Sequence, residues 1–314
     1  MHTACIGINS RTEQGGKVYP AILVKRVLLA VVTIDAKLAR RMLPARKSDS
    51  KKGDNGIVLV AGGSRFYHGA PILTSMAALR SGADLVYSAV PRSIINPVRS
   101  FSPNIIALPL PDDKLTVGSA NRLVAMMPKH ADSAAVGMGM SIAGPESIRA
   151  LVRNLRQLGT SILLDASALI PEILPDLSGT GAIVTPHAGE YARLFQREPG
   201  KTEKERIANV AAAAKEHDVT ILLKGPTDVV SDGIRTGVNR IHNCAMTVGG
   251  TGDVLAGIAA GLMARMKSFE AALLATFING VAGNTAYKKA GLHIVATDLV
   301  DSIPAAMKPF DKIK

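Results

Sequence analysis

Short apolar runs alternate with amphipathic segments along most of the chain. The run Ile57 to Ala61 is entirely apolar and predicts a buried strand. Further strands are expected at 84–90, 105–110, 134–137, 162–165, 182–184 and 219–224, and helices between them at 70–81, 119–130, 145–158, 188–195 and 202–217. Because the strands lack polar alternation and are separated by helices, the pattern indicates a parallel sheet buried on both faces.

The last third of the chain departs from this alternation. Residues 228–233 and 234–239 predict a hairpin that turns at Asp232-Gly233. Two long helices, at 251–266 and 268–289, are expected to finish the fold. The expected fold class is therefore α/β, with a central, mostly parallel sheet between two layers of helices.

The first fifty residues differ from the rest. Residues 35–42 predict a short helix and residues 45–56 a loop. A chain of 314 residues suits one large domain, so we expect a basic, partly disordered leader at 1–50 and a single catalytic domain at 51–314. Apolar residues make up 47% of the chain but aromatics only 4%, which predicts an aliphatic core.

The net charge of +12 is concentrated near the amino end. Residues 1–52 hold eleven Lys and Arg against three Asp and Glu. Such a segment with almost no aromatic residues is poor evidence for a nucleic-acid surface, and no nucleic-acid partner is expected. A solvated face or a rim that attracts phosphates explains the charge more simply.

Targeting and cysteine signals favour a cytoplasmic protein. The run Val27 to Val32 follows Lys25-Arg26 but is only about half the length of a signal-peptide core, and no cleavage site follows. No run approaches the roughly 20 apolar residues that cross a bilayer. Cys5 and Cys244 are expected to be free thiols. The first 15 or so residues are expected to be disordered or even untranslated.

Polar and small residues follow the predicted strands, where ligands bind in open parallel sheets. They are Gly62-Gly63-Ser64, Gly137-Met138-Gly139, Asp165, Thr185-Pro186-His187, Lys224-Gly225 and the loop 249–253.

The loop 249–253 carries the strongest chemical signal. Glycines let backbone N–H groups approach an anion, and the apolar helix that starts at Thr251 directs the positive end of its dipole to the same place, so Gly249, Gly250, Thr251 and Gly252 predict an anion hole. Asp253 either stabilises its own helix or removes a proton from a substrate hydroxyl that attacks a phosphoryl group. A carboxylate beside a phosphate site favours the second interpretation.

Three other features have two interpretations each. Lys224 to Asp228 either meets phosphates or ribose of a nucleotide or forms an ordinary turn. His187, with Glu190 three residues later, either caps a helix or contacts a polar substrate. Asp165 closes an apolar strand, so it must be hydrogen-bonded or assist a metal, whose ligands the sequence does not identify.

Together the motifs resemble the ADP/ATP-dependent NAD(P)H-hydrate dehydratases of the ribokinase-like superfamily, which are related to carbohydrate kinases. The similarity covers about 52–304. Its motifs are KGDNGIVLVAGGS (52–64), HGAPILTSMAALRSGADLV (68–86), LLDASAL (163–169), VTPHAGE (184–190), LLKG (222–225) and MTVGGTGDVLAG (246–257).

The resemblance implies a repair enzyme that dehydrates hydrated NADH and NADPH at the expense of ADP or ATP, with Mg²⁺ accompanying the nucleotide. It implies Asp253 as the base and as a hydrate contact. The hydrate would also be bound by Ala70, Gly139 and His187, and the adenine nucleotide by Lys224, Gly225, Pro226, Thr227, Asp228 and Gly252. Asp165 and Asn243 are expected to support the site, and the family implies a homotetramer.

Two motifs depart from the family's pattern. The stretch 240–245, RIHNCA, stands where the family usually has glycines, and DASAL at 165–169 stands for the common DADAL. These changes leave the choice between ADP and ATP open. Fifty residues are too few for the fused epimerase domain of many relatives, so we expect any epimerase to be a separate protein.

Two other functions compete with dehydration. A small-molecule kinase for a vitamin precursor or a sugar would use the same anion hole and the same Asp253. A binding protein that has lost the chemistry, with the basic leader docking an acidic partner, would not need an intact 249–253 loop.

Overall fold

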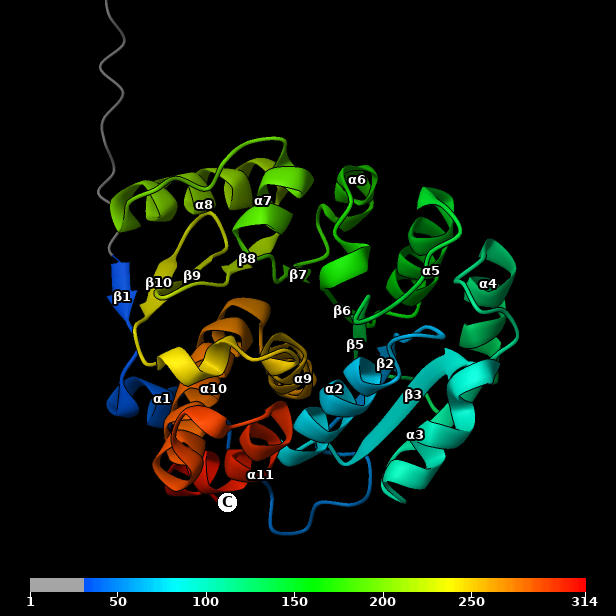
Figure 1. Cartoon of the computed structure of the whole chain (residues 1–314), viewed down its shortest axis with the longest axis horizontal. Helices are drawn as coiled ribbons and strands as arrows, with labels where there is room; N and C mark the ends of the chain where they lie inside the picture. Colours follow the sequence, from blue (N-terminus) through cyan, green and yellow to red (C-terminus); the bar gives the residue numbers. More distant parts are fainter. Residues whose placement is uncertain (1–30) are drawn as a thin grey trace, which may run out of the picture.

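A ten-stranded sheet forms the centre of the molecule (Figure 1). The structure is a computed structural model and describes residues 31–314. The strands lie in the order β1-β10-β9-β8-β7-β6-β5-β2-β3-β4. Their bounds are β1 Val31–Thr33, β2 Ile57–Ala61, β3 Leu85–Pro91, β4 Ile106–Leu110, β5 Ser133–Val136, β6 Ser161–Leu164, β7 Ile183–Val184, β8 Thr220–Leu223, β9 Asp228–Ser231 and β10 Thr236–Asn239.

The sheet is mostly parallel, as the apolar runs predict. All neighbouring strands from β4 to β8 run parallel to one another. β9 is antiparallel to both β8 and β10, and the register pairs Ser231 with Thr236. The expected hairpin around Asp232-Gly233 is thereby confirmed.

Helices cover both faces of the sheet (Figure 1). One layer, α1, α2, α9, α10 and α11, shares a hydrophobic core with one face, and α4 to α8 share a second core with the other. Their bounds are α1 Ala36–Met42, α2 Gly69–Arg80, α3 Ile95–Phe101, α4 Val117–Met126, α5 Pro145–Gln157, α6 Leu174–Leu177, α7 Ala188–Phe195, α8 Glu203–His217, α9 Thr251–Met263, α10 Ser268–Ala290 and α11 Ala296–Met307.

Strand β2 shows why its sequence is continuously apolar. Val58 and Val60 belong to the core on one face, and Leu59 and Ala61 to the core on the other. Successive side chains of a strand point to opposite faces, so a strand between two helical layers needs apolar residues at every position. Full burial of each Val or Leu side chain contributes about 1.5–3 kcal/mol. The three-layer α/β/α class is confirmed.

The expectation that two long helices finish the fold is wrong. A third helix, α11, follows α10 and contains Pro304 in its interior. Helix α3, between β3 and β4, contains Pro97 and was also not expected. Proline removes a backbone donor and usually argues against a helix. In α11 the burial of residues such as Leu299 and Ile303 compensates for that loss.

From residue 31 onward the expected leader joins the sheet. β1 pairs in parallel with β10, aligning Val32 with Gly237, and Arg46 forms a bridge with Ile313. Asp35 accepts a hydrogen bond from the N–H of Leu38 and caps α1, which confirms the short helix. The remainder of the Val27 to Val32 run, before residue 31, lies outside the described residues. No helix within 31–314 is long and apolar enough to cross a membrane.

Candidate active site

A tight glycine turn places the start of α9 at the carboxyl edge of the sheet. Gly250 is the residue that precedes α9, and its φ of 94° is a left-handed conformation that favours glycine. A Cβ at this position would lie 2.7 Å from Leu73 Cδ1 and 2.9 Å from Ala296 Cβ. Both backbone conformation and space therefore require glycine here.

The amides of this loop are free to bind a ligand. Within the described part of the chain, the N–H groups of residues 249–253 donate to no protein acceptor, and the first helical bond runs from Val254 N to Gly250 O at 3.0 Å. The hydroxyl of Thr251 donates to the carbonyls of Met246 and Val248, at 2.9 and 3.2 Å, and so fixes the loop. Unpaired amides at a helix N-terminus attract anions.

Asp253 lies beside these amides and is not a helix cap. Its carboxylate accepts no hydrogen bond from any residue between 31 and 314, and its Oδ2 lies 4.0 Å from the position a Gly250 Cβ would occupy. Its backbone carbonyl accepts a hydrogen bond from Thr74 Oγ1 at 3.1 Å, which ties α9 to α2. Asp253 as a residue is partly exposed, so a substrate can approach it.

Burial raises the pKa of Asp253 to about 7. This value already includes the carboxylates of Asp165 and Glu190, which raise the pKa, and the ammonium of Lys224, which lowers it. A carboxyl group with a pKa near the working pH is an effective proton acceptor because it is partly ionised and still basic. The environment therefore supports the role that the sequence indicates for Asp253.

Lys224 lies between two carboxylates at the end of β8. Its Nζ is 2.9 Å from Asp165 Oδ1 and 3.5 Å from Glu190 Oε2. Burial alone would lower the pKa of Lys224, but the two carboxylates raise it above its ordinary value. The side chain of Asp165 is only 3% exposed, and its bond to Lys224 confirms that this carboxylate is hydrogen-bonded.

His187 caps α7. Its Nδ1 accepts the N–H groups of Gly189 and Glu190, at 3.1 and 3.3 Å, and Glu190 Oε2 accepts the N–H of His187 at 2.9 Å. The capping interpretation is thus confirmed. The His187 side chain remains 61% exposed, so its outer edge is accessible, and the substrate contact stays a prediction.

The structure brings Gly139 and Ala70 together. Gly139 follows β5 with a φ of 62°, and Ala70 lies in the first turn of α2. A Cβ on Gly139 would lie 3.1 Å from Ala70 Cβ and 2.8 Å from Tyr67 Cβ. These two residues, predicted to bind the hydrate, therefore form one surface even though about 70 residues separate them.

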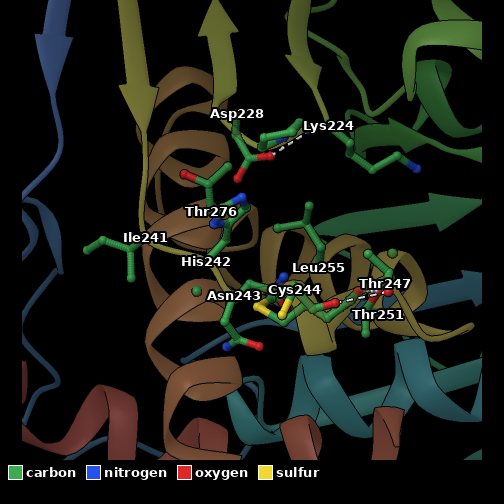
Figure 2. A pocket seen from close by; sticks show the side chains of 16 residues that line it. Lys224, Asp228, Ile241, His242, Asn243, Cys244, Thr247, Thr251, Leu255 and Thr276 are labelled. Atoms are coloured by element: carbon green, nitrogen blue, oxygen red, sulfur yellow. Dashed lines mark hydrogen bonds between the residues drawn. The ribbon is translucent and has the colours of Figure 1, made fainter. Parts of the chain in front are cut away.

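A cavity of about 460 Å³ opens on one side of the start of α9 (Figure 2). Among the predicted nucleotide residues, those that line it are Lys224, Gly225, Pro226, Asp228 and Gly252, and Thr251 and Asn243 line it as well. Thr227 is not part of the lining, and its hydroxyl donates to Glu203 Oε2 at 3.0 Å. Asp253, Gly249 and Gly250 are also not part of its lining.

Two residues that line the cavity stabilise the neighbouring backbone and side chains by hydrogen bonds. Asp228 accepts hydrogen bonds from Gly225 N at 3.1 Å and from Asn239 Nδ2 at 3.2 Å, and burial raises its pKa to about 6. Asn243 accepts the N–H of Ala245 at 3.1 Å and caps a short 3₁₀ turn. Asn243 therefore supports the segment that departs from the family's glycine-rich pattern.

Sequence reasoning missed the part of the cavity that α10 provides. Thr276, Asn279 and Gly280 line it from this helix. Asn279 is 8% exposed, and its Oδ1 has no hydrogen-bond partner in the described chain. The signal was available, because polar and small residues at spacings of three and four interrupt an otherwise apolar helix. His242 and Cys244, which belong to the departing stretch 240–245, also line the cavity.

The fold and the site together define a ribokinase-like, nucleotide-dependent enzyme. A three-layer α/β/α sheet presents a pocket of open amides, a cavity large enough for a nucleotide portion, and a proton acceptor at its carboxyl edge.

Comparison with known proteins identifies the family within this class of enzymes. The family model described as NAD(P)H-hydrate dehydratase matches residues 58–305, and the chain belongs to this family. It is 51% identical to the ADP-dependent (S)-NAD(P)H-hydrate dehydratase of Nitrosopumilus maritimus over 91% of this chain and 100% of the relative. It is 52% identical to the protein of the same name from Cenarchaeum symbiosum, over 88% of this chain and 96% of the relative.

A solved structure supports the fold. The ADP/ATP-dependent NAD(P)H-hydrate dehydratase of Bacillus subtilis, co-crystallised with ATP and Mg²⁺, superimposes with a TM-score of 0.78. The alignment covers 90% of this chain and 99% of the other at 24% identity.

Proposed function

We propose that this protein repairs hydrated NADH and NADPH by dehydrating them with ADP as the phosphoryl donor. One observation carries the proposal: the Asp253 carboxylate, with a pKa of about 7, lies beside the unpaired amides of residues 249–253. The preference for ADP over ATP rests on the names of the two archaeal relatives, both of which are called ADP-dependent.

The chemistry divides into two steps. Asp253 accepts the proton of the hydrate's hydroxyl, whose oxygen attacks the terminal phosphoryl group of ADP, and the bond between that group and AMP breaks. The amides of 249–253 stabilise the charge on the transferred group. The phosphorylated hydrate then loses inorganic phosphate and the proton of the neighbouring carbon, which restores the double bond of the dihydronicotinamide ring.

The two substrates are assigned to the two sides of the loop. The adenine nucleotide is held in the 460 Å³ cavity by Lys224, Gly225, Pro226, Asp228 and Gly252. Thr227, which the family resemblance also assigns to the nucleotide, lies outside the cavity lining and would contact the nucleotide only at its margin. The hydrate is held by Ala70, Gly139, His187 and Asp253. Support comes from the close approach of Gly139 to Ala70 and from the position of Asp253 outside the cavity lining. Asp165 acts through Lys224, and Asn243 through the segment that it caps.

The residues fit a Mg²⁺ ion that arrives with the nucleotide. Within residues 31–314 no three His, Cys, Asp or Glu side chains are grouped to hold a metal by themselves. Mg²⁺ is usually held by one or two carboxylates together with substrate phosphates. Asp253 belongs to the loop of open amides, and of the two carboxylates that raise its pKa, Asp165 acts more strongly, so Asp253 and Asp165 are the residues that would hold the ion. When bound, the ion would neutralise phosphate charge.

A direct assay tests the function. Purified protein, Mg²⁺ and ADP are mixed with NADH hydrate, and the recovery of NADH absorbance is followed together with AMP and inorganic phosphate. We expect one AMP and one phosphate for each NADH. A stable phosphorylated product without phosphate release would identify a small-molecule kinase instead, and a higher kcat/KM with ATP would overturn the ADP preference.

The proposal includes a homotetramer in the cytoplasm. Light scattering coupled to gel filtration tests the assembly, and we expect a mass four times the 32.8 kDa of one chain. A monomeric mass would overturn the tetramer without affecting the proposed reaction.

A further inference from the structure

A second concentration of charge lies at the amino edge of the sheet, opposite Asp253. α9 has 13 residues, so its far end lies about 20 Å from its start. Beyond that end, a cavity of about 380 Å³ is lined by the segment between α1 and β2, by the carboxyl ends of α2, α9 and α11, and by residues 311–313. We call it the basic cavity; its charged lining residues are Arg46, Arg80, Arg265, Lys308, Lys312 and Asp311.

The cations come from distant parts of the chain. Figure 1 shows the end of α11, the carboxyl terminus and the segment between α1 and β2 at the same end of the molecule. A neighbouring hollow of about 350 Å³ shares Arg46 with the basic cavity and adds three more cations, Lys47, Lys51 and Lys52. Like charges repel, so their convergence from several segments needs a compensating interaction.

Pairing with carboxylates does not supply that compensation. Among the described cations of these two hollows, only Arg46 forms a salt bridge, to Asp84 Oδ1 at 2.9 Å. Arg265 donates to the carbonyls of Pro44 and Ala45, both at 3.3 Å. Burial lowers the pKa of Arg265, and the nearby charge of Arg46 lowers it further.

Helix ends compensate only part of the charge. Three helices, α2, α9 and α11, direct their carboxyl ends to the basic cavity, and each end carries about half a negative charge. The combined negative charge of the three helix ends, Asp84 and Asp311 is smaller than the positive charge of the five cations of the basic cavity. The difference is more than about one charge. The lysines of the neighbouring hollow increase the surplus.

We propose that the basic cavity binds a small anion that carries two or more phosphate groups. The five cations combine the fork-shaped guanidinium groups of arginine with the point charges of lysine, and both recognise phosphate. The volume lies in the range of small-molecule sites, about 300–1,000 Å³. The apolar side chains of Leu43, Pro304 and Met307 add a wall for an uncharged part of the ligand.

The basic cavity and the neighbouring hollow together contain four of the eleven basic residues of the amino-terminal sequence 1–52. Arg46, Lys47, Lys51 and Lys52 lie at the amino edge of the sheet, so they cannot form a rim that draws phosphates to Asp253. The site is thus separate from the proposed reaction.

Calorimetry with inorganic tripolyphosphate tests the proposal on the full chain. We compare the unaltered protein with the double variant Arg80→Gln, Lys308→Gln, because both side chains are exposed and neither forms a hydrogen bond or salt bridge within residues 31–314. We expect one tripolyphosphate per chain at the basic cavity, besides any anion bound at the loop 249–253, and an affinity of the cavity at least roughly tenfold weaker in the variant. The matched control is Lys288→Gln, Lys289→Gln, which removes the same charge from exposed positions on α10.

The outcomes separate the possibilities. An unchanged affinity in the control together with weaker binding in Arg80→Gln, Lys308→Gln supports the basic cavity. The proposal fails if no heat of binding is measured or if the control variant weakens binding equally. It also fails if Arg80→Gln, Lys308→Gln leaves binding unchanged, because the anion would then bind at the loop 249–253. A preference for an acidic peptide over tripolyphosphate would also overturn it. None of these results bears on the dehydratase assay.

Discussion

The two ends of α9 carry side chains of opposite charge, and only one of the two charged groups has hydrogen-bond partners among the described residues. Asp253 lies in the first turn and Arg265 just beyond the last, so each charge matches the helix dipole at its own end. Burial works against both, raising the pKa of Asp253 and lowering that of Arg265. Arg265 donates to two backbone carbonyls, whereas the Asp253 carboxylate accepts nothing from the described residues.

The difference is the one expected between a charged side chain that serves the fold and one that serves a reaction. A buried charge without a partner destabilises the fold, and such sites persist where function requires them. If Asp253 is the proposed proton acceptor, its unpaired state favours reaction, whereas the hydrogen bonds of Arg265 favour folding. The following changes test that distinction, beginning with the largest expected effect.

Replacing Asp253 by Asn should abolish most of the turnover. Asn cannot accept the proton, so kcat should fall by at least about 10²-fold, while ADP binding measured by calorimetry stays within a few-fold. The control is Asp301→Asn, an exposed carboxylate on α11. Equal turnover in both variants would remove Asp253 from the mechanism.

Replacing Asp165 by Ala should lower stability strongly. It leaves the Lys224 ammonium with the more distant Glu190 alone, and removal of one partner of a buried pair costs about 3–5 kcal/mol. Urea denaturation measures the loss. The double variant Asp165→Ala, Lys224→Met should recover much of it, because no unpaired charge remains; equal stability of the single and double variants would contradict the pairing.

The reaction should depend on pH through Asp253. Its ionised form is the proton acceptor, and its pKa in the protein is about 7. Below that value kcat/KM should fall about tenfold per pH unit, and above it the rate should level off. A profile that is flat between pH 5 and 8 would show that another group accepts the proton.

Asp253→Asn should also make the protein more stable at high pH. The folded pKa of about 7 exceeds the ordinary value of 3.8, so the stability associated with the protonated form is present below pH 3.8 and is lost as pH rises through about 7. At pH 8 the variant should gain about 1–3 kcal/mol in the free energy of unfolding, and near pH 4 much less. A loss of stability at pH 8 would mean that the carboxylate has a partner.

Arg265→Met should have the smallest effect on the free energy of unfolding, and it should decrease stability, whereas Asp253→Asn increases it at high pH. It removes two hydrogen bonds to the carbonyls of Pro44 and Ala45 but keeps the apolar part of the side chain. We expect a loss of about 1 kcal/mol in denaturant unfolding and an unchanged kcat. A large change in kcat would connect the two ends of α9 functionally.

The sequence predicted local structure better than distant contacts. Strands such as β2 and the glycine loop before α9 follow from patterns within about ten residues, and both are present as expected. α11 was missed because Pro304 argues against a helix, whereas tertiary burial of one face decides the outcome.

The site was only partly predictable for the same reason. Strand ends indicated Asp165, Lys224 and Asp253, because parallel strands bring their carboxyl ends to one edge. The contribution of Asn279 from α10, and the convergence of basic residues at the other edge, depend on how distant segments pack. The spacing of polar residues marks one face of α10, but it does not show which part of the molecule that face meets.

Cys244 offers a chemical reporter of the nucleotide cavity. Its thiol is exposed and lies in the cavity wall, and the chain contains only one other cysteine, Cys5. A Cys5→Ser protein would therefore carry a single label site at the place where the nucleotide is proposed to bind. Protection of that thiol from maleimide would give the occupancy of the cavity directly, without any turnover.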